Sequence, residues 1–178
     1  AQHTYEKVNY SQIVSSAALI KVDHMIHVQS GYQALDLGPQ SEAWNTVMVD
    51  HHNCRFGKWY ESGVGFQHFS HLPSYRDIDP LHQAVHKHMH ETLEFTSNKE
   101  WRKNLRFHQK LQEGFMAIED NSIQLIALID LMTDEKLKFE TAADDNSEIE
   151  TEIDFSIFTP MISVRKVKVA IYNKIFFI

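Results

Sequence analysis

The residues best suited to chemistry in this chain are one cysteine and the histidines around it. Cys54 is the only cysteine among 178 residues, and ten of the twelve histidines lie between His24 and His90. A lone thiol cannot form an internal disulfide, which leaves packing, reactivity, intermolecular pairing or metal binding. A thiolate surrounded by imidazoles is the ligand chemistry of zinc. The sequence therefore predicts first that Cys54 is a zinc ligand.

His82 and His86 could supply two further ligands. They stand four residues apart in a predicted helix, so both imidazoles project from one face. Such a pair alone is more typical of a solvated helix face, and His90 continues the same spacing. His24 lies on the apolar stripe of an earlier helix, where it suits either a ligand or a core histidine bonded to a carbonyl. If three helices converge, these residues and Cys54 complete a closed tetrahedral zinc site.

Four predicted helices position these residues. The first, over 12–35, has a stripe at spacings of three and four, namely Ile13, Ala17, Ile20, His24, His27, Gly31 and Leu35. A second helix is expected from about 44 to 63 and a loop over 66–75. The third should begin at Asp79-Pro80, where Asp caps the helix and Pro suits its first turn, and should end near Phe95.

The fourth predicted helix has the clearest pattern. Ser97 followed by Glu100 resembles a capping box, and the apolar pattern fades near Phe139. One heptad seam contains Trp101, Leu111, Phe115, Ile118, Ser122, Leu125, Ile129 and Met132. The outer face keeps other apolar residues, which indicates a dimer. The sequence predicts an all-α, antiparallel four-helix bundle over 1–140 with zinc in its core, then an acidic linker and a basic apolar tail over 141–178.

Composition excludes several classes of function. A formal net charge of −7 argues against nucleic-acid binding, and the few Gly and Pro residues favour long helices. The N-terminus lacks the basic start and apolar core of a signal peptide. The apolar stretch 161–178 carries four Lys and Arg residues and is a poor membrane span. A cytoplasmic protein that does not associate with membranes is therefore expected.

The string HHNCRFGKWY, with KVDHMIHVQSGYQAL before it and LHQAVH after it, resembles the bacterial chemoreceptor zinc-binding domain, CZB. That family has a His on its first helix, a Cys-x-hydrophobic-Gly-x-Trp core and a later His-x-x-x-His pair. The matching ligands here are His24, Cys54, His82 and His86, and the core adds Phe56, Gly57 and Trp59. The resemblance covers roughly residues 12–135. It implies a zinc site made of one cysteine and three histidines.

One departure concerns His27, because the family usually has an aromatic residue or leucine three positions after its first ligand. His27 is therefore a second candidate on the first helix, although the register favours His24. His51 and His52 are the histidines nearest to Cys54 in sequence and are expected beside the site.

The resemblance implies a regulatory module of chemoreceptors, and sometimes of diguanylate cyclases, that senses zinc or oxidants and is usually dimeric. Zinc binding needs the thiolate and neutral imidazoles, and oxidation of Cys54 would weaken its ligation, so Cys54 is the expected redox switch. The expected partners are a second copy and a signalling output domain or the chemotaxis machinery.

No catalytic apparatus is expected. A catalytic zinc keeps an open position for water, and the sequence has no His-Glu-x-x-His string, phosphate loop or serine elbow. Two other functions fit the same helices. A hemerythrin-like di-iron bundle would need paired inward carboxylates, and a structural zinc-stabilised dimerisation module would sense nothing.

Overall fold

The computed structural model describes residues 2–97 and 99–143, almost all of them within one compact unit, Ala1–Ala142. These residues form six α-helices, one 3-10 helix and no strand. The elements are α1 (Gln2–Leu37), α2 (Glu42–Val47), α3 (Arg55–Glu61), α4 (Val64–Phe69), α5 (Tyr75–Glu94), η1 (Lys99–Lys103) and α6 (Leu105–Ala143). The predicted all-α class is confirmed for this part of the chain, whereas the four-helix bundle stays a prediction.

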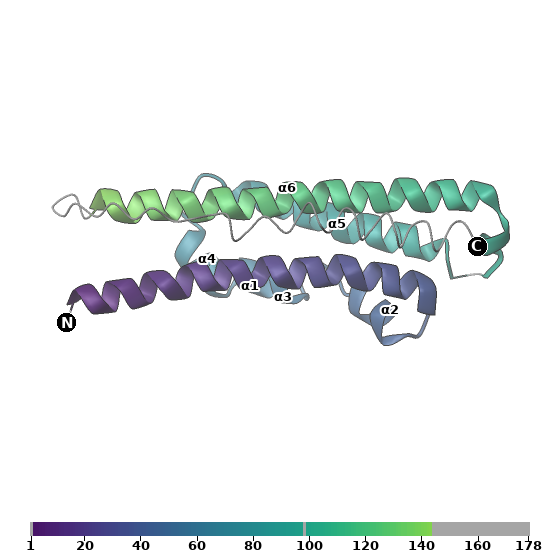
Figure 1. Ribbon diagram of the computed structural model, residues 1–178, viewed down its shortest axis with the longest axis horizontal. Helices are drawn as coiled ribbons and strands as arrows, with labels where there is room; N and C mark the ends of the chain where they lie inside the picture. Colours follow the sequence, from purple (N-terminus) through teal and green to yellow (C-terminus); the bar gives the residue numbers. More distant parts are fainter. Residues whose placement is uncertain (1, 98, 144–178) are drawn as a thin grey trace. The chain divides into compact units, whose positions relative to one another are not determined.

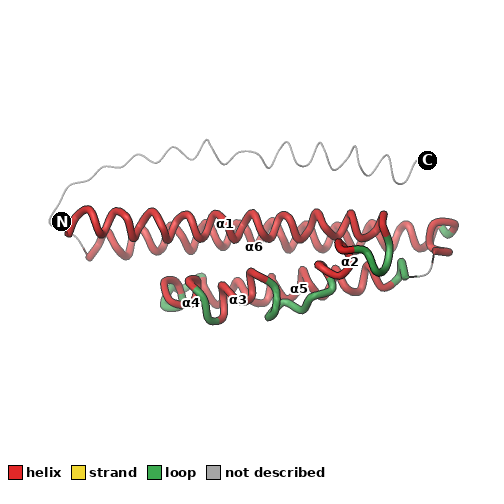
Figure 2. The backbone as a smooth tube through the Cα atoms, turned by 90° about the horizontal axis from the view of Figure 1, so that it is seen from below, coloured by secondary structure: helices red, strands yellow, loops and turns green. Residues whose placement is uncertain are grey.

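The two longest helices, α1 and α6, have nearly parallel axes (Figure 1). Lys21 contacts Asp130, and Tyr32 contacts Glu119. Because positions rise along α1 as they fall along α6, the two helices run in opposite directions. The short helices α2, α3 and α4 lead back along α1, and α5 lies beside them (Figure 2). The segment that contains Cys54 is therefore held between α1 and α5.

The single second helix predicted over 44–63 is wrong, because this stretch forms α2, a loop and α3. Ser41 caps α2 through a 3.1 Å bond from the Trp44 N–H, and the helix ends at Val47. The predicted loop over 66–75 is also partly wrong, because α4 continues to Phe69. Phe69 is fully buried, so packing of this side chain supports a helical turn that has no clear sequence period.

The third predicted helix begins earlier than its Asp-Pro signal indicates. α5 starts at Tyr75 and places Pro80 inside the helix, which removes one backbone hydrogen bond. Tyr75 and Ile78 are buried in this extra turn. Burial of two large side chains outweighs the missing bond, since each contributes roughly 1.5–3 kcal/mol.

The predicted stripes of the first and fourth helices are confirmed as buried faces, except that His27 is half-buried. The N-terminal capping box of the fourth helix is wrong. Ser97 instead donates to the carbonyl of Glu94, and buried Trp101 belongs to η1. α6 begins at Leu105, after Asn104, whose side-chain oxygen accepts the Arg106 N–H at 3.0 Å. An asparagine at this position is a favourable helix cap.

One cluster of buried apolar side chains connects five helices, namely α1, α3, α4, α5 and α6. Aromatic residues fill its centre, and Cys54 and Trp59 pack at its border. Its buried members are Ile13, Ala17, Ile20, Phe56, Phe69, Leu72, Tyr75, Ile78, Leu125, Ile129 and Met132. Any displacement of α3 therefore disturbs contacts with both long helices.

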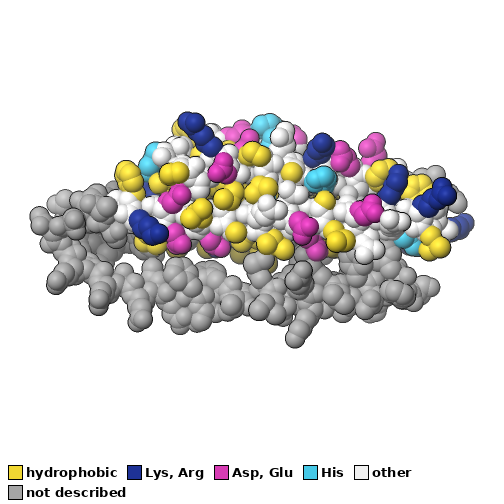
Figure 3. Space-filling model, turned by 90° about the horizontal axis from the view of Figure 1, so that it is seen from above, with side chains coloured by type: hydrophobic (Ala, Val, Ile, Leu, Met, Phe, Trp, Pro, Cys, Tyr) yellow, Lys and Arg dark blue, Asp and Glu magenta, His cyan; other side chains and the backbone are white. Residues whose placement is uncertain are grey.

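The surface also carries apolar side chains. Figure 3 shows them along the length of one face, interspersed with acidic groups. One exposed row on α1 consists of Leu19, Val22 and Ile26, and another on α6 consists of Met116, Ile123 and Leu131. Ile126, which was expected on the outer face, is half-buried. The spacings are three and four on α1 and seven and eight on α6, so each row lies on one helix face.

The acidic linker and basic tail predicted over 141–178 lie outside the described residues, apart from the last turn of α6. Among the described helices, none combines the length and apolar character needed to cross a membrane.

Two helical glycines allow a matched test of the packing around α3. A Cβ on Gly57 would lie 2.0 Å from the carbonyl oxygen of His51, whereas a Cβ on Gly31 would meet only the flexible end of Met89. Alanine raises helix propensity by about 1 kcal/mol at either position. We expect Gly57→Ala to be the more destabilising, by about 1–3 kcal/mol, in urea unfolding. Equal effects of the two substitutions would contradict this close approach.

Candidate metal centre

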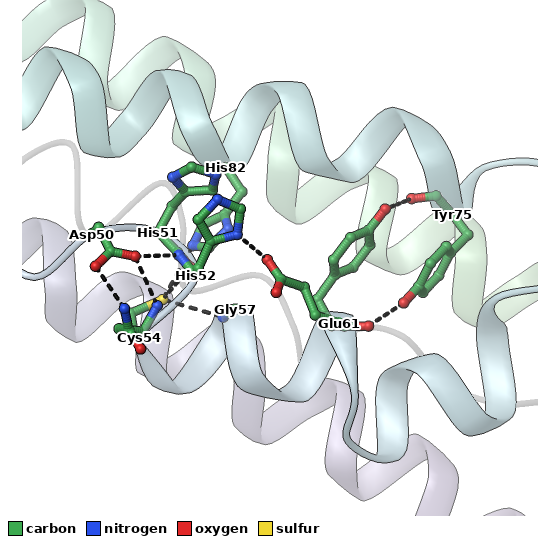
Figure 4. Close-up of polar contacts among 10 residues, drawn as sticks. Asp50, His51, His52, Cys54, Gly57, Glu61, Tyr75 and His82 are labelled. Carbon is green, nitrogen blue, oxygen red and sulfur yellow. Dashed lines mark hydrogen bonds and ion pairs between the residues drawn. The ribbon is translucent and has the colours of Figure 1, made fainter.

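The loop between α2 and α3 is shaped by Asp50 and brings Cys54 toward α5. The Asp50 carboxylate accepts the backbone N–H groups of His52 at 3.0 Å and Asn53 at 3.1 Å, and the Asn53 side chain at 2.7 Å. The Asp50 carbonyl accepts the Cys54 N–H at 3.2 Å. These bonds are drawn around Asp50 in Figure 4. They fix the backbone from which the thiol projects.

Cys54 is also the N-terminal cap of α3. Its sulfur accepts the Gly57 N–H at 3.2 Å, and its thiol donates to the His51 carbonyl at 3.4 Å. A capping side chain satisfies an N–H group that the helix leaves unpaired. The bonding of this sulfur is therefore coupled to the start of α3.

The α5 histidines meet the thiol. The Cys54 sulfur lies 3.3 Å from Nε2 of His82, and ligand atoms of Cys54, His82 and His86 lie within 4.8 Å of one another. Nδ1 of His86 donates to the Val49 carbonyl at 2.9 Å, which leaves its Nε2 as the nitrogen with a free lone pair. His82 and His86 are only 1% and 3% exposed. The predicted pair is therefore part of an internal cluster and not a solvated helix face.

His24 lies close to this cluster on α1. Its ring centroid is 6.4 Å from that of His82 and 6.0 Å from that of Phe56. The side chain is 2% exposed, and its Nε2 is buried without a hydrogen-bond partner. The other sequence interpretation is a core histidine bonded to a backbone carbonyl, and Nε2 of His24 makes no such bond. An unpartnered buried nitrogen is costly unless something else binds it.

His27 has the same property. Its ring centroid lies 4.3 Å from that of His86, and its Nε2 is also buried without a partner. α1 thus offers two unpartnered nitrogens, one on the ring near His82 and one on the ring near His86. Sequence reasoning identified both positions but could not distinguish their surroundings.

Burial holds the central histidines neutral. It lowers the pKa of His24 to about 3, of His82 to about 2 and of His86 to about 4. Neighbouring histidines lower the pKa values of His24 and His82 further, while the bond to the Val49 carbonyl raises that of His86. Neutral imidazole is the form that binds metals, so these residues are ready to ligate at pH 7.

Burial also raises the pKa of the Cys54 thiol. The Gly57 and Phe56 N–H groups oppose this rise, and the charges of Asp50 and Glu61 add to it. A cysteine without a bound cation in this place is a thiol at pH 7. A divalent metal would convert it to a thiolate, because the positive charge stabilises the anion.

The remaining motif residues support the site by packing. The Phe56 ring lies 4.3 Å from that of His82, and Trp59 packs 5.7 Å from Phe69. Gly57 leaves room for the His51 carbonyl, as described above. These contacts place α3 directly against the ligand helix α5.

Three further histidines lie around the cluster. The His51 ring centroid is 5.9 Å from that of His82, while exposed His52 pairs with Glu61. His90 bonds through Nε2 to the Val47 carbonyl at 3.0 Å.

The sequence interpretation missed the contributions of Asp50 and of the Val47 and Val49 carbonyls. Asp50 with Asn53 three residues later is a turn signal that could have indicated the break between α2 and α3. Backbone acceptors carry no sequence signal, so Val47 and Val49 could not have been found.

The sulfur of Cys54 and the nitrogens of His82 and His86 are donors that fit zinc. Donors in a tetrahedral zinc site lie about 3.3–3.8 Å apart, and the sulfur–nitrogen distance of 3.3 Å between Cys54 and His82 agrees with this. The unpartnered nitrogen of His24 is available as a fourth donor. No carboxylate belongs to this cluster, which disfavours a di-iron centre among the described residues. Bound zinc would supply positive charge that holds the sulfur as thiolate.

The neutral histidines predict acid sensitivity of the metal-free protein. An unfolded histidine binds a proton near pH 6.5, whereas His24, His82 and His86 stay neutral in the folded state until about pH 4 or below. Their stabilising contribution is fully present above pH 6.5 and is lost as pH falls toward the folded values. We expect the urea concentration at the unfolding midpoint to decrease as the pH is lowered from about 7.5 to about 5.0. His68→Gln, on α4, should show the same fall, and a midpoint independent of pH would contradict the expectation.

Comparison with known proteins agrees with this geometry. No curated protein and no solved structure matches the chain. Residues 24–93 match the model of a domain family, and this segment contains His24, Cys54, His82 and His86. The family resemblance is thereby confirmed: over residues 24–93 the chain matches the chemoreceptor zinc-binding domain family, CZB.

Proposed function

We propose that this chain is a zinc-binding regulatory domain of a bacterial cytoplasmic signalling protein of the chemoreceptor type. One zinc ion is held by His24, Cys54, His82 and His86. The domain senses zinc or oxidants and passes the change to an output domain or to the chemotaxis machinery. The family match supports zinc-binding and signalling, and the ligand set is inferred from the cluster.

The observation that carries the proposal is that ligand atoms from two elements lie within 4.8 Å of one another, with a histidine of a third element beside them. The loop before α3 supplies a sulfur, α5 supplies two nitrogens, and α1 offers a buried nitrogen without a partner. With four protein ligands the site is closed, so zinc has no position for a substrate or for catalytic water. A regulatory function therefore suits the site better than catalysis.

Zinc binding would change how these elements are joined. Without metal, the Cys54 sulfur makes a neutral contact with Nε2 of His82, and His24 makes no polar contact through Nε2. With metal, α1, α5 and the start of α3 share one ion. Release of zinc then loosens three elements at once, which an attached domain could read as movement.

Oxidation can act at the same site. Cys54 is half-buried, whereas His24, His82 and His86 are buried. Oxidants attack the thiolate, which bound zinc would maintain despite the raised pKa of the free thiol. A sulfenic acid is a poorer ligand, and the same sulfur caps α3. Cys54 is therefore proposed as the redox switch.

The proposed partner is a second copy of the chain. The exposed rows on α1 (Leu19, Val22, Ile26) and α6 (Met116, Ile123, Leu131) each lie on one helix face, so they suit pairing with another helix. The proposed bundle has α1, the α2–α4 segment, α5 and α6 as its four arms, within a domain over 1–140. A structural zinc-stabilised dimer without sensing would have the same contacts.

The first test concerns the metal. The purified protein should bind one zinc per chain, and cobalt in its place should show a thiolate-to-cobalt charge-transfer band. Cys54→Ala should abolish that band, lower zinc affinity by about tenfold or more and remove any conformational response to peroxide. Metal analysis, visible spectroscopy and hydrogen exchange at α3 measure these effects.

His68→Gln is the matched control, because it removes a histidine from α4 outside the cluster. It should keep the band, the affinity and the response. Two irons per chain would favour a di-iron bundle. A Cys54→Ala protein with unchanged zinc affinity and unchanged peroxide response would show that the proposed site is wrong, and zinc binding without any conformational response would favour the structural module.

The second test concerns the dimer. Ile123→Lys introduces a charge into the exposed row of α6 and should shift the protein toward monomer in sedimentation velocity experiments. Leu105→Lys is the matched control, because Leu105 is 82% exposed at the start of α6 and outside the row. A monomeric unmodified protein, or dimers equally stable in both variants, would contradict this interface.

A further inference from the structure

The zinc site has one candidate nitrogen more than it needs. His24 and His27 are three residues apart on α1 and therefore lie on one helix face. The His24 ring lies 6.4 Å from that of His82, and the His27 ring lies 4.3 Å from that of His86. Each histidine of α1 thus faces one histidine of α5.

Both nitrogens are unpartnered in the same way. Nε2 of His24 and Nε2 of His27 are buried and accept or donate no hydrogen bond. A closed site built on Cys54 and the α5 pair needs one further ligand, so it satisfies only one of them. The other remains buried beside the metal without a partner, at a cost in free energy, and would be available to bind if a position at the metal became vacant.

Cys54 is the ligand whose loss would create that other state. It is half-buried in a loop, whereas His82 and His86 are almost fully buried in the middle of the twenty-residue helix α5. It is also the one ligand that oxidants modify readily. A vacancy in this site therefore arises first at the position of the sulfur.

We propose that His27 is a reserve ligand, meaning a ligand that binds zinc only after the Cys54 sulfur has left. A peroxide transfers one oxygen to the thiolate, so the sulfur loses two electrons and becomes sulfenic acid while the O–O bond breaks and hydroxide leaves. Nε2 of His27 then takes the vacated position. Zinc stays bound by His24, His27, His82 and His86.

The exchange would change which elements the metal joins. In the reduced protein zinc links α1, α5 and the start of α3; in the oxidised protein it links only α1 and α5. Oxidation would thus free α3 without loss of zinc. One thiol would condense with the sulfenic acid to a mixed disulfide and water, and a second thiol would release the Cys54 thiol and restore the first state. This inference rests on the proposed zinc site and adds that the metal remains bound through the switch.

The experiment compares the full chain with Cys54→Ala, His27→Leu and the double variant, with His51→Leu as the matched control. His51 is the control because its ring is also near His82, at 5.9 Å, but its nitrogens are not among the buried unpartnered atoms. Cobalt spectra report the donor set, and competition with a chelator gives zinc affinity.

Cys54→Ala should lose the thiolate-to-cobalt band yet keep the bands of tetrahedral cobalt, with zinc affinity lowered by roughly tenfold. Addition of His27→Leu should lower affinity by at least about a further 100-fold, whereas His27→Leu alone should change it less than about threefold. His51→Leu should have little effect in either background. Equal affinities of Cys54→Ala and the double variant would overturn the proposal, as would a larger loss with His51→Leu.

Circular dichroism checks that the double variant keeps its helices. A second measurement does not need that variant. After treatment with hydrogen peroxide, the unmodified protein should keep its zinc and His27→Leu should release it to a colorimetric chelator. If both proteins release zinc, or both retain it, His27 is not a reserve ligand. If the unmodified protein shows no thiolate-to-cobalt band at all, the proposed zinc site itself has failed.

Discussion

The contact between the Cys54 sulfur and Nε2 of His82 is the constraint on which the arrangement of the middle of the chain depends. It joins a loop to the centre of a long helix, and the same sulfur caps α3. Around it, Asp50 fixes the loop and Phe56 packs on the His82 ring. Three short helices, each with at most seven residues, would have little stability alone. Their positions follow from this anchor and from the apolar cluster below it.

The histidine cluster carries an energetic cost that a bound metal would offset. Polar nitrogens are rarely buried without partners, and two imidazole nitrogens of α1 are in that condition. The same burial keeps the central histidines neutral. Neutral histidines lower the stability of the fold in acid, but they are the form that binds a metal. Binding of zinc therefore offsets a penalty already present in the folded chain. Metal binding and stability of this region are coupled for that reason.

The long elements and the residues that gather in the cluster could be predicted from sequence, and the connections could not. The heptad seam from Leu111 to Met132 and the stripe from Ile13 to Leu35 specify which faces are buried, because helical periodicity is a strong signal. The early start of α5 depends on burial of Tyr75 and Ile78, a tertiary effect that outweighed the signal of Pro80. The tautomer of His86 depends on a backbone carbonyl, which leaves no pattern in the sequence.

The placement of the four proposed ligands separates rigid donors from an adjustable one. The nitrogens of His24, His82 and His86 belong to the long helices α1 and α5, whose buried faces resist local displacement. The sulfur of Cys54 comes from a loop before a seven-residue helix and is only half-buried. A chemical change at the sulfur therefore acts first on its own short element, while the nitrogens stay in position. Phe56, the second residue of α3, belongs to the cluster that also contains Leu125 and Ile129 of α6, so a movement that begins at Cys54 reaches a long helix through packing alone.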